Sequence, residues 1–317
     1  MYLTKDEIKL VDQMQKGDRV ALGRLMTLAE SRHRSLPGIL GLINSSAYGS
    51  YVIGITGPPG AGKSTITDKL IGQYRAQDKR VGVIAVDPSS PFSGGSILGD
   101  RVRMHEHSMD DGVFIRSLSS RGLSGGLARS VSEMIKLYGA FGMDYVIVET
   151  VGVGQTELDI MDIADTVVVV LVPEAGDAVQ TMKAGLMEIA DVFVVNKADR
   201  EGAKVLASEI KSIISIKSSK DNWEPPVLLT SAHVNEGIAE LKNRVEAHKN
   251  YLHRTGRFKK IRGKRKEQEF SLIVKENMES EFGKKLQSED VKEIYELVKS
   301  GEIDPYEGAK RVIQKIM

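Results

Sequence analysis

The sequence of 317 residues contains no cysteine. This absence excludes disulfide bonds, catalytic thiols and thiolate metal sites. It fits a protein kept in a reducing compartment, and we expect a cytoplasmic protein. The amino terminus, MYLTKDEIKL, is charged and lacks the long apolar core of a signal peptide.

The sequence also lacks long apolar runs and a large net charge. The longest apolar run covers residues 167–172, which is far too short to cross a bilayer. The 44 Lys and Arg residues balance the 43 Asp and Glu residues, so the formal net charge is +1. Because the chain has no strong overall charge to attract nucleic acid or membrane, we expect neither as a partner.

A glycine- and proline-rich segment lies between an apolar run and a stretch with helical periodicity. Residues 51–56, YVIGIT, predict a buried strand, and residues 63–77 predict a helix. The segment between them completes the pattern G-x-x-x-x-G-K-[ST], which holds phosphates with backbone N–H groups at a helix N-terminus. We expect Lys63 to reach the β- and γ-phosphates and Ser64 to hold Mg²⁺. The expected nucleotide-binding residues of this motif are Gly57, Pro58, Pro59, Gly60, Ala61, Gly62, Lys63, Ser64 and Thr65.

Strands and helices alternate from residue 51 to about residue 250. Further strands are predicted at 81–86, 113–118, 145–149, 166–172, 192–196 and 227–230. The other predicted helices are 125–141, 157–163, 178–189, 201–216 and 235–250. Continuous Val and Ile runs are typical of parallel strands that are buried on both faces. The pattern predicts an α/β protein with a doubly wound, mostly parallel sheet, whose ligands lie at the carboxyl ends of the strands.

Acidic residues follow two of these strands. Asp87 follows strand 81–86, and Asp100 and Arg103 come at the end of the long Ser- and Gly-rich loop after it. Glu149 ends strand 145–149, where a Walker-B carboxylate meets Mg²⁺ directly or through water. We expect the backbone N–H of Gly152, three residues later, to sense the γ-phosphate.

The residues after strand 192–195 predict the base that is bound. Asn196, Lys197 and Asp199 form the pattern N-K-x-D. The Asp199 carboxylate can accept hydrogen bonds from guanine N1–H and the 2-amino group, whereas adenine offers neither donor. The pattern therefore predicts GTP and GDP as ligands. The residues after the last strand, expected to brace the base, are Ser231, Ala232 and His233.

Helical regions flank this alternating part. We divide the chain into an N-terminal helical region (1–50), a nucleotide-binding domain (51–250) and a C-terminal helical region (251–317). Residues 4–7 form a capping box, Asp18 suits an N-cap, and Pro37 suits a third short helix that ends near Gly49.

Two further patterns suggest binding sites less strongly. Residues 254–266 contain eight basic residues and no acid, which we interpret as a linker because Phe258 is the one aromatic residue available to stack on a base. His105 and His107 flank Glu106, but residues two apart do not share a helix face, so we do not expect a metal site.

Four segments, taken together and in order, carry a family resemblance: GPPGAGKST, AVDPSSPFSGGSILGDRVRM, VIVETVGVGQTE and NKAD. They closely resemble the MeaB/ArgK/MMAA GTPases, which are chaperones of adenosylcobalamin-dependent methylmalonyl-CoA mutase, and the similarity runs over nearly the whole chain. The resemblance implies a P-loop GTPase with Mg²⁺ as cofactor and such a mutase as partner. It also implies that the C-terminal helices form a homodimerisation arm.

The resemblance also implies roles for individual residues. Ser64, Asp87, Asp100 and Glu149 would surround Mg²⁺, and Arg103 would lie near the phosphates. Residues 172–183 would form an additional switch loop in which Gln180 and Lys183 are active. The implied catalytic residues are then Lys63, Asp87, Asp100, Arg103, Glu149 and Lys183.

Other functions stay open at this point. A pure nucleotide switch would use slow hydrolysis only as a timer, with partner binding as its function. Nickel chaperones share the GTPase class but use Cys and His metal motifs, which the absence of cysteine disfavours. The older ArgK description as a kinase requires a protein phosphoacceptor that nothing in the sequence identifies. No residue is an obvious water-orienting base, since Gln155 is three positions beyond Gly152.

Overall fold

The computed structural model describes residues 3–87, 107, 109–119, 126–150, 160–173, 185–216, 223–286 and 289–316. The chain forms two compact units, Met1–Thr255 and Gly256–Met317.

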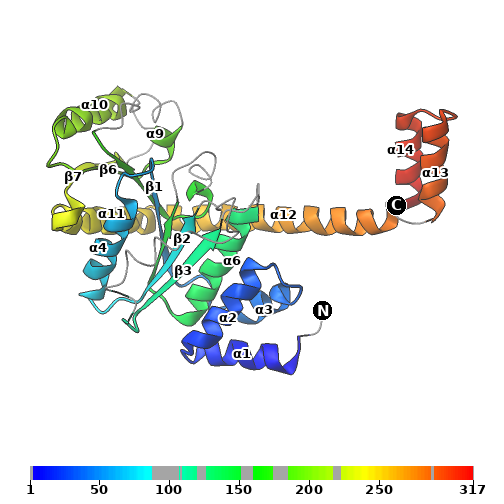
Figure 1. Cartoon of the computed structure of the whole chain (residues 1–317), viewed down its shortest axis with the longest axis horizontal. Coiled ribbons are helices and arrows are strands. Elements are labelled where there is room, and N and C mark those ends of the chain that lie inside the picture. The colour runs from blue at the N-terminus through cyan, green and yellow to red at the C-terminus, as the bar shows by residue number, and fades with distance from the viewer. Residues whose placement is uncertain are drawn as a thin grey trace. The chain divides into compact units, whose positions relative to one another are not determined.

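The first unit is built around a parallel sheet (Figure 1). Its strands are β1 (Tyr51–Thr56), β2 (Val81–Asp87), β3 (Val113–Ser119), β4 (Tyr145–Glu149), β5 (Thr166–Leu171), β6 (Val192–Asn196) and β7 (Val227–Thr230). Their order in the sheet is β3-β2-β4-β1-β5-β6-β7, and every pairing is parallel. Strands β1, β4, β5 and β6 are buried along their whole length, as continuous Val and Ile runs require. The predicted doubly wound α/β fold is confirmed.

Helices cover both faces of this sheet. The helix α4 (Lys63–Arg75) contacts β1, β2 and β4, and it lies beside α11 (Ile238–Arg254), which contacts β5, β6 and β7. On the other face, one hydrophobic cluster joins strand residues such as Val52 and Val146 to three further helices. These helices are α6 (Gly126–Phe141), α9 (Leu186–Ile189) and α10 (Ala203–Ile216).

The N-terminal helices belong to the same compact unit. They are α1 (Lys5–Gln15), α2 (Arg19–Glu30) and α3 (Leu36–Ile43), and their buried side chains join the cluster around α6. The Thr4 side chain accepts from the backbone N–H of Glu7, whose carboxylate accepts from the Thr4 N–H, so the predicted capping box is present. Asp18 caps α2 as predicted. Helix α3 ends at Ile43, before the expected end near Gly49.

Two predicted helices are seen only in part. Of the stretch expected at 157–163, the structure describes a single 3₁₀ turn, Ile160–Asp162. Of the stretch expected at 178–189, it describes α9. Residues 157–159 and 178–184 of these predictions lie outside the described part of the chain.

The second unit contains α12 (Arg257–Leu286), α13 (Glu289–Ser300) and α14 (Pro305–Ile316). Val291 and Ile294 of α13 and Val312 of α14 form its small core, and Asp304 Oδ1 caps α14 by accepting two backbone N–H groups. Residues 254–266, interpreted from the sequence as a linker, contain the boundary between the two units, and they are largely helical, because α11 continues to Arg254 and α12 begins at Arg257. In the described parts of the chain, no helix has the length and apolar character needed to cross a membrane.

A buried polar and aromatic cluster lies at the amino ends of β1 and β5. His248 of α11 is 3% exposed, and its Nδ1 lies 2.9 Å from Thr166 Oγ1. Trp223, in the segment before β7, donates its indole N–H to the Asp191 carbonyl at 2.9 Å, and its ring centroid lies 4.8 Å from that of His248. Burial lowers the pKa of His248 to about 4, with Asp165 opposing the shift.

Candidate functional site

The loop between β1 and α4 has the backbone conformation that its glycines predict. Gly57, Gly60 and Gly62 have φ values of +138°, +74° and +88°, in the region that disfavours other residues. A Cβ atom on Gly57 would lie 2.0 Å from the Val170 carbonyl oxygen of β5. The loop can therefore lie this close to β5 only because residue 57 has no side chain.

Lys63 is the first residue of α4, and its side chain folds back over this loop. The residue is 6% exposed, and its Nζ donates to the carbonyl oxygens of Gly57 at 2.8 Å and Pro58 at 3.0 Å. The ammonium group thus lies over the loop, at the N-terminus of α4. A positive charge and the positive end of the helix dipole at one place favour a bound anion.

The Glu149 carboxylate, at the end of β4, is held by two hydroxyl groups of α4. Ser64 Oγ donates to Glu149 Oε1 at 2.6 Å, and Thr67 Oγ1 donates to Glu149 Oε2 at 2.9 Å. Glu149 is 5% exposed. The sequence motifs predict Ser64 and Glu149 as neighbours, but neither motif includes Thr67. Its signal is its position three residues after Ser64, which places both hydroxyls on one helix face.

Part of the expected metal and catalytic set cannot be placed. Asp87 ends β2, and the register that pairs Ala85 with Glu149 puts its backbone at the same edge of the sheet as the Glu149 carboxylate. The Asp87 side chain lies outside the described structure, as do four whole residues: Asp100, Arg103, Gly152 and Lys183.

Asn196 connects the phosphate loop to the end of β7. It is 3% exposed, and its Nδ2 donates to the Ala61 carbonyl at 2.8 Å. Its Oδ1 accepts from Thr230 Oγ1 at 3.1 Å and from the Ala232 N–H at 3.2 Å. The first residue of the N-K-x-D pattern is therefore fully engaged within the protein.

The charged residues of this pattern are less buried than Asn196. Asp199 is exposed, and Lys197 adopts a φ of +58°, a turn conformation that lets the chain leave β6 sharply. The Ser231 N–H bonds to the Glu236 carbonyl in a short bridge, while His233 is exposed. An accessible carboxylate beside a braced backbone loop is the arrangement that a guanine base requires.

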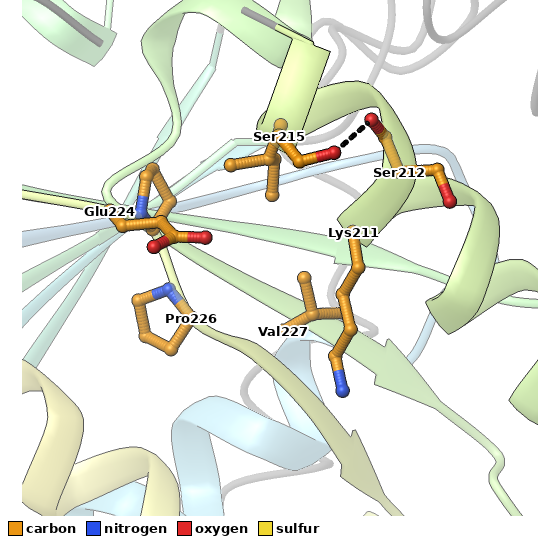
Figure 2. A pocket seen from close by; sticks show the side chains of 8 residues that line it. Lys211, Ser212, Ser215, Glu224, Pro226 and Val227 are labelled. Atoms are coloured by element: carbon orange, nitrogen blue, oxygen red, sulfur yellow. Dashed lines mark hydrogen bonds between the residues drawn. The ribbon is translucent and has the colours of Figure 1, made fainter. Parts of the chain in front are cut away.

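The described residues offer no competing metal site. They contain no cluster of three or more His, Asp or Glu side chains that could hold an ion. A hollow of about 460 Å³ (Figure 2) lies between the end of α10 and the amino end of β7, the end of that strand opposite to Thr230. It is lined by Lys211, Ser212, Ile214, Ser215, Glu224, Pro225, Pro226 and Val227. The phosphate loop takes no part in it.

Comparisons with known proteins agree with this geometry. The family described as methylmalonyl Co-A mutase-associated GTPase MeaB matches residues 22–287. A putative GTPase of Pyrococcus abyssi is 47% identical over 312 residues, covering 98% of this chain and 96% of that protein. GTPase ArgK of Escherichia coli is 34% identical, covering 96% and 95% of the two chains. A solved structure of an LAO/AO transport system kinase has a TM-score of 0.70 and 28% identity, and covers 100% of this chain and 99% of that one.

The family match spans most of the chain, and the relatives align along nearly their whole length. The predicted resemblance is thereby confirmed. The phosphate loop, the hydroxyl-bound Glu149 and the N-K-x-D segment lie at one edge of the sheet, in a chain that belongs to the MeaB/ArgK family of GTPases.

Proposed function

We propose that this GTPase requires Mg²⁺ and acts as a chaperone that gates loading and protection of the cobalamin cofactor of an adenosylcobalamin-dependent acyl-CoA mutase. Methylmalonyl-CoA mutase is the first candidate, because the matching family is described as associated with that enzyme. The observation that supports the chemistry best is the direct contact between the phosphate-loop helix and Glu149.

The oxygen atoms at this point suit Mg²⁺. Ser64 Oγ and Glu149 Oε1 lie 2.6 Å apart, and hydroxyl and carboxylate oxygens are the ligands that Mg²⁺ prefers. We propose that Ser64, Asp87, Asp100 and Glu149 hold the ion or its water ligands. When bound, Mg²⁺ would supply positive charge to the phosphate oxygens.

The protein's own contribution to hydrolysis is positioning and charge. The oxygen of a water molecule would attack the γ-phosphorus, the bond between that phosphorus and the oxygen bridging to the β-phosphate would break, and the products would be inorganic phosphate and GDP. Lys63 is already held over the loop by two carbonyl groups, so exchanging these for phosphate oxygens needs only a local movement. Its charge would stabilise the charge that develops during transfer. Arg103 is proposed to assist at the phosphates.

Replacement of Glu149 tests this arrangement. Glu149→Ala should slow GTP hydrolysis much more than it weakens GDP binding, because a lost metal contact matters most to transition-state charge. The measurements are single-turnover hydrolysis and calorimetric GDP binding across a Mg²⁺ titration. Thr67→Val is the matched control, since it removes one hydrogen bond to Glu149 and keeps the carboxylate. Equal losses in hydrolysis and GDP affinity for Glu149→Ala would show that the residue is structural.

The partner is tested separately. Capture from native cells with GTP-loaded protein should recover an acyl-CoA mutase, and that mutase should change the rate of GTP turnover. A pure nucleotide switch would bind its partner without any change in turnover. The kinase named for the solved relative would transfer labelled γ-phosphate to a protein, whereas a GTPase releases it as free phosphate.

We also propose that the second unit mediates a homodimer.

A further inference from the structure

Helix α4 and strand β4 are joined at both ends of their contact. At the nucleotide end, the hydroxyls of Ser64 and Thr67 donate to the carboxylate of Glu149, the last residue of β4. At the other end, the ring of Tyr74 stacks on that of Tyr145, with centroids 4.0 Å apart and planes inclined by 24°. The helix and the strand are thus held together on either side, and the Glu149 carboxylate is placed against α4.

Thr67 is a buried polar residue in the interior of α4. Its exposure is 0%, and its Oγ1 donates to Glu149 Oε2 at 2.9 Å. A threonine within a helix commonly turns its hydroxyl to the carbonyl oxygen four residues earlier, which here would be that of Lys63. The Thr67 hydroxyl is directed instead at a side chain of β4. Because a β-branched residue has few rotamers in a helix, this donor has a fixed direction.

The two hydroxyls that hold Glu149 differ in their distance from the phosphate loop. Ser64 is the second residue of α4 and belongs to the motif that binds phosphates and Mg²⁺, so its hydroxyl has a second task when the nucleotide is bound. Thr67 lies outside that motif, about 4.5 Å further along the helix axis than Ser64. Its bond to Glu149 can therefore persist while Ser64 serves the ion.

A hydrogen bond to each carboxylate oxygen restricts Glu149 more than one bond does. Its side chain has three rotatable bonds, so a single bond to one oxygen leaves several orientations open. Thr67 holds Oε2, and Oε1 is turned to Ser64 at 2.6 Å. Partners that orient a metal ligand in this way typically contribute about 10- to 100-fold to metal affinity or activity.

We propose that Thr67 is a positioning residue of this GTPase, which holds the Glu149 carboxylate where Mg²⁺ or its water ligands bind. Thr67 acts through Glu149 and makes no contact of its own with the nucleotide or the ion. The inference deepens the proposed function, because it rests on the role proposed there for Glu149. It adds to the site a residue that none of the sequence motifs contains.

Two substitutions test the hydroxyl of Thr67. Thr67→Val removes it and keeps the shape of the side chain, whereas Thr67→Ser keeps the hydroxyl. For Thr67→Val, we expect the Mg²⁺ concentration that half-saturates GTP hydrolysis to rise about tenfold. The affinity of the GDP-bound protein for Mn²⁺, measured by electron paramagnetic resonance, should fall about as much, while GDP affinity without metal stays within about twofold. Thr67→Ser should recover most of both metal readouts.

Tyr74→Phe is the matched control on the same helix. Tyr74 is also 0% exposed, and its hydroxyl donates to Glu246 Oε1 at 3.0 Å, so the variant loses one hydrogen bond of α4 at the end away from the nucleotide. It should keep the wild-type metal readouts even if its melting temperature falls as far as that of Thr67→Val. The proposal is overturned if Thr67→Val keeps the wild-type metal readouts, if Thr67→Ser fails to recover them, or if Tyr74→Phe shifts them equally.

Glu149→Ala, measured in parallel, separates this inference from the proposed function. Thr67→Val keeps the carboxylate, so its loss of metal affinity should be the smaller of the two, and the double variant should be no weaker than Glu149→Ala alone. If Glu149→Ala loses metal affinity and Thr67→Val does not, Thr67 has no positioning role and the proposed metal site stands. If Glu149→Ala keeps the metal affinity of the wild type, the proposed metal site is wrong, and this inference fails with it.

Discussion

Asn196 and Asp199 are three residues apart, and the structure gives them different tasks. Asn196 is buried and uses both ends of its amide on the protein, holding the phosphate loop to the end of β7. Asp199 is exposed at the turn after β6. Substitution of Asn196 should therefore disturb the phosphate loop itself, whereas substitution of Asp199 should change which base is bound.

Asp199→Asn should weaken GTP binding and favour xanthosine triphosphate. The xanthine 2-oxo group replaces a donor of guanine with an acceptor, which the new amide N–H can meet. Wild-type protein should reject ATP by about 10⁴-fold, as expected of a site built for these hydrogen bonds. Calorimetry with GTP, ATP and xanthosine triphosphate checks both statements, and equal affinity of the wild type for ATP and GTP would contradict the guanine assignment.

His248 should make the stability of the first unit depend on pH. Its pKa is about 4 in the folded protein and near 6.5 when unfolded. As the pH falls from 6.5 to 4, the unfolded chain binds a proton that the folded chain does not, so the free energy of unfolding falls by up to about 3 kcal/mol. His248→Asn keeps a polar atom near Thr166 and removes the titration. Urea unfolding followed by circular dichroism should show a shallower pH dependence for the variant, and parallel curves would contradict the assignment.

At the scale of elements, the strands follow from the sequence better than the helices do. Short apolar runs rich in β-branched residues predict strands, and β1, β4, β6 and β7 have the predicted bounds. Helix ends depend on tertiary contacts that periodicity does not contain. Thus α3 ends early at Ile43, and the basic segment after Arg254 is helical, because Lys and Arg favour helices where nothing opposes them.

The candidate site likewise has features that the sequence predicts and features that it does not. The phosphate loop and Glu149 could be predicted because their spacing is local and their chemistry is narrow. The contacts of Thr67 with Glu149 and of Asn196 with Ala61 could not, because they join residues 82 and 135 positions apart.

Lys183 follows strand β5 in the sequence. We propose that Lys183 supplies a charge to the nucleotide site when the mutase binds. Lys183→Ala should leave basal hydrolysis and GTP affinity nearly unchanged and abolish stimulation by the mutase, since arginine-finger systems gain about 10³-fold or more from a charge delivered in this way. The measurement is steady-state GTPase rate with and without saturating mutase.

The matched control for Lys183 is Lys204→Ala, which removes an exposed cation of α10. It should be stimulated as fully as the wild type. If Lys183→Ala is stimulated to the same extent, the proposed role of Lys183 is wrong.

At the scale of the whole molecule, the two compact units differ in how their apolar residues are used. The first unit encloses a large core on both faces of its sheet. In the second unit, α12 carries Phe270 and Met278 at 68% exposure each, and Val274 lies between them at 38%. Spacings of four residues place these side chains on one helix face, which favours contact with another apolar surface.

If the second unit mediates the proposed homodimer, deletion of residues 256–317 should leave a folded, GTP-binding protein that elutes as a monomer, whereas the full chain should elute as a dimer. The cut follows Thr255 because the first compact unit ends there. Size-exclusion chromatography with light scattering and GTP calorimetry are the measurements. A truncated protein that is insoluble would show that the second unit completes the core of the first, and one that stays dimeric would place the dimer interface elsewhere.

Trp223 is the single tryptophan of the chain, and its surroundings make it a built-in optical probe. Its indole N–H is bonded to the Asp191 carbonyl, and its ring lies beside His248 and Tyr251. It sits in the segment that leads into β7, whose far end carries the backbone loop expected at the base. Fluorescence excited at the long-wavelength edge of the absorption band, where tryptophan absorbs and tyrosine does not, therefore comes from one known position. A change in its intensity on adding nucleotide would report that the base-binding half of the sheet responds, with no label attached.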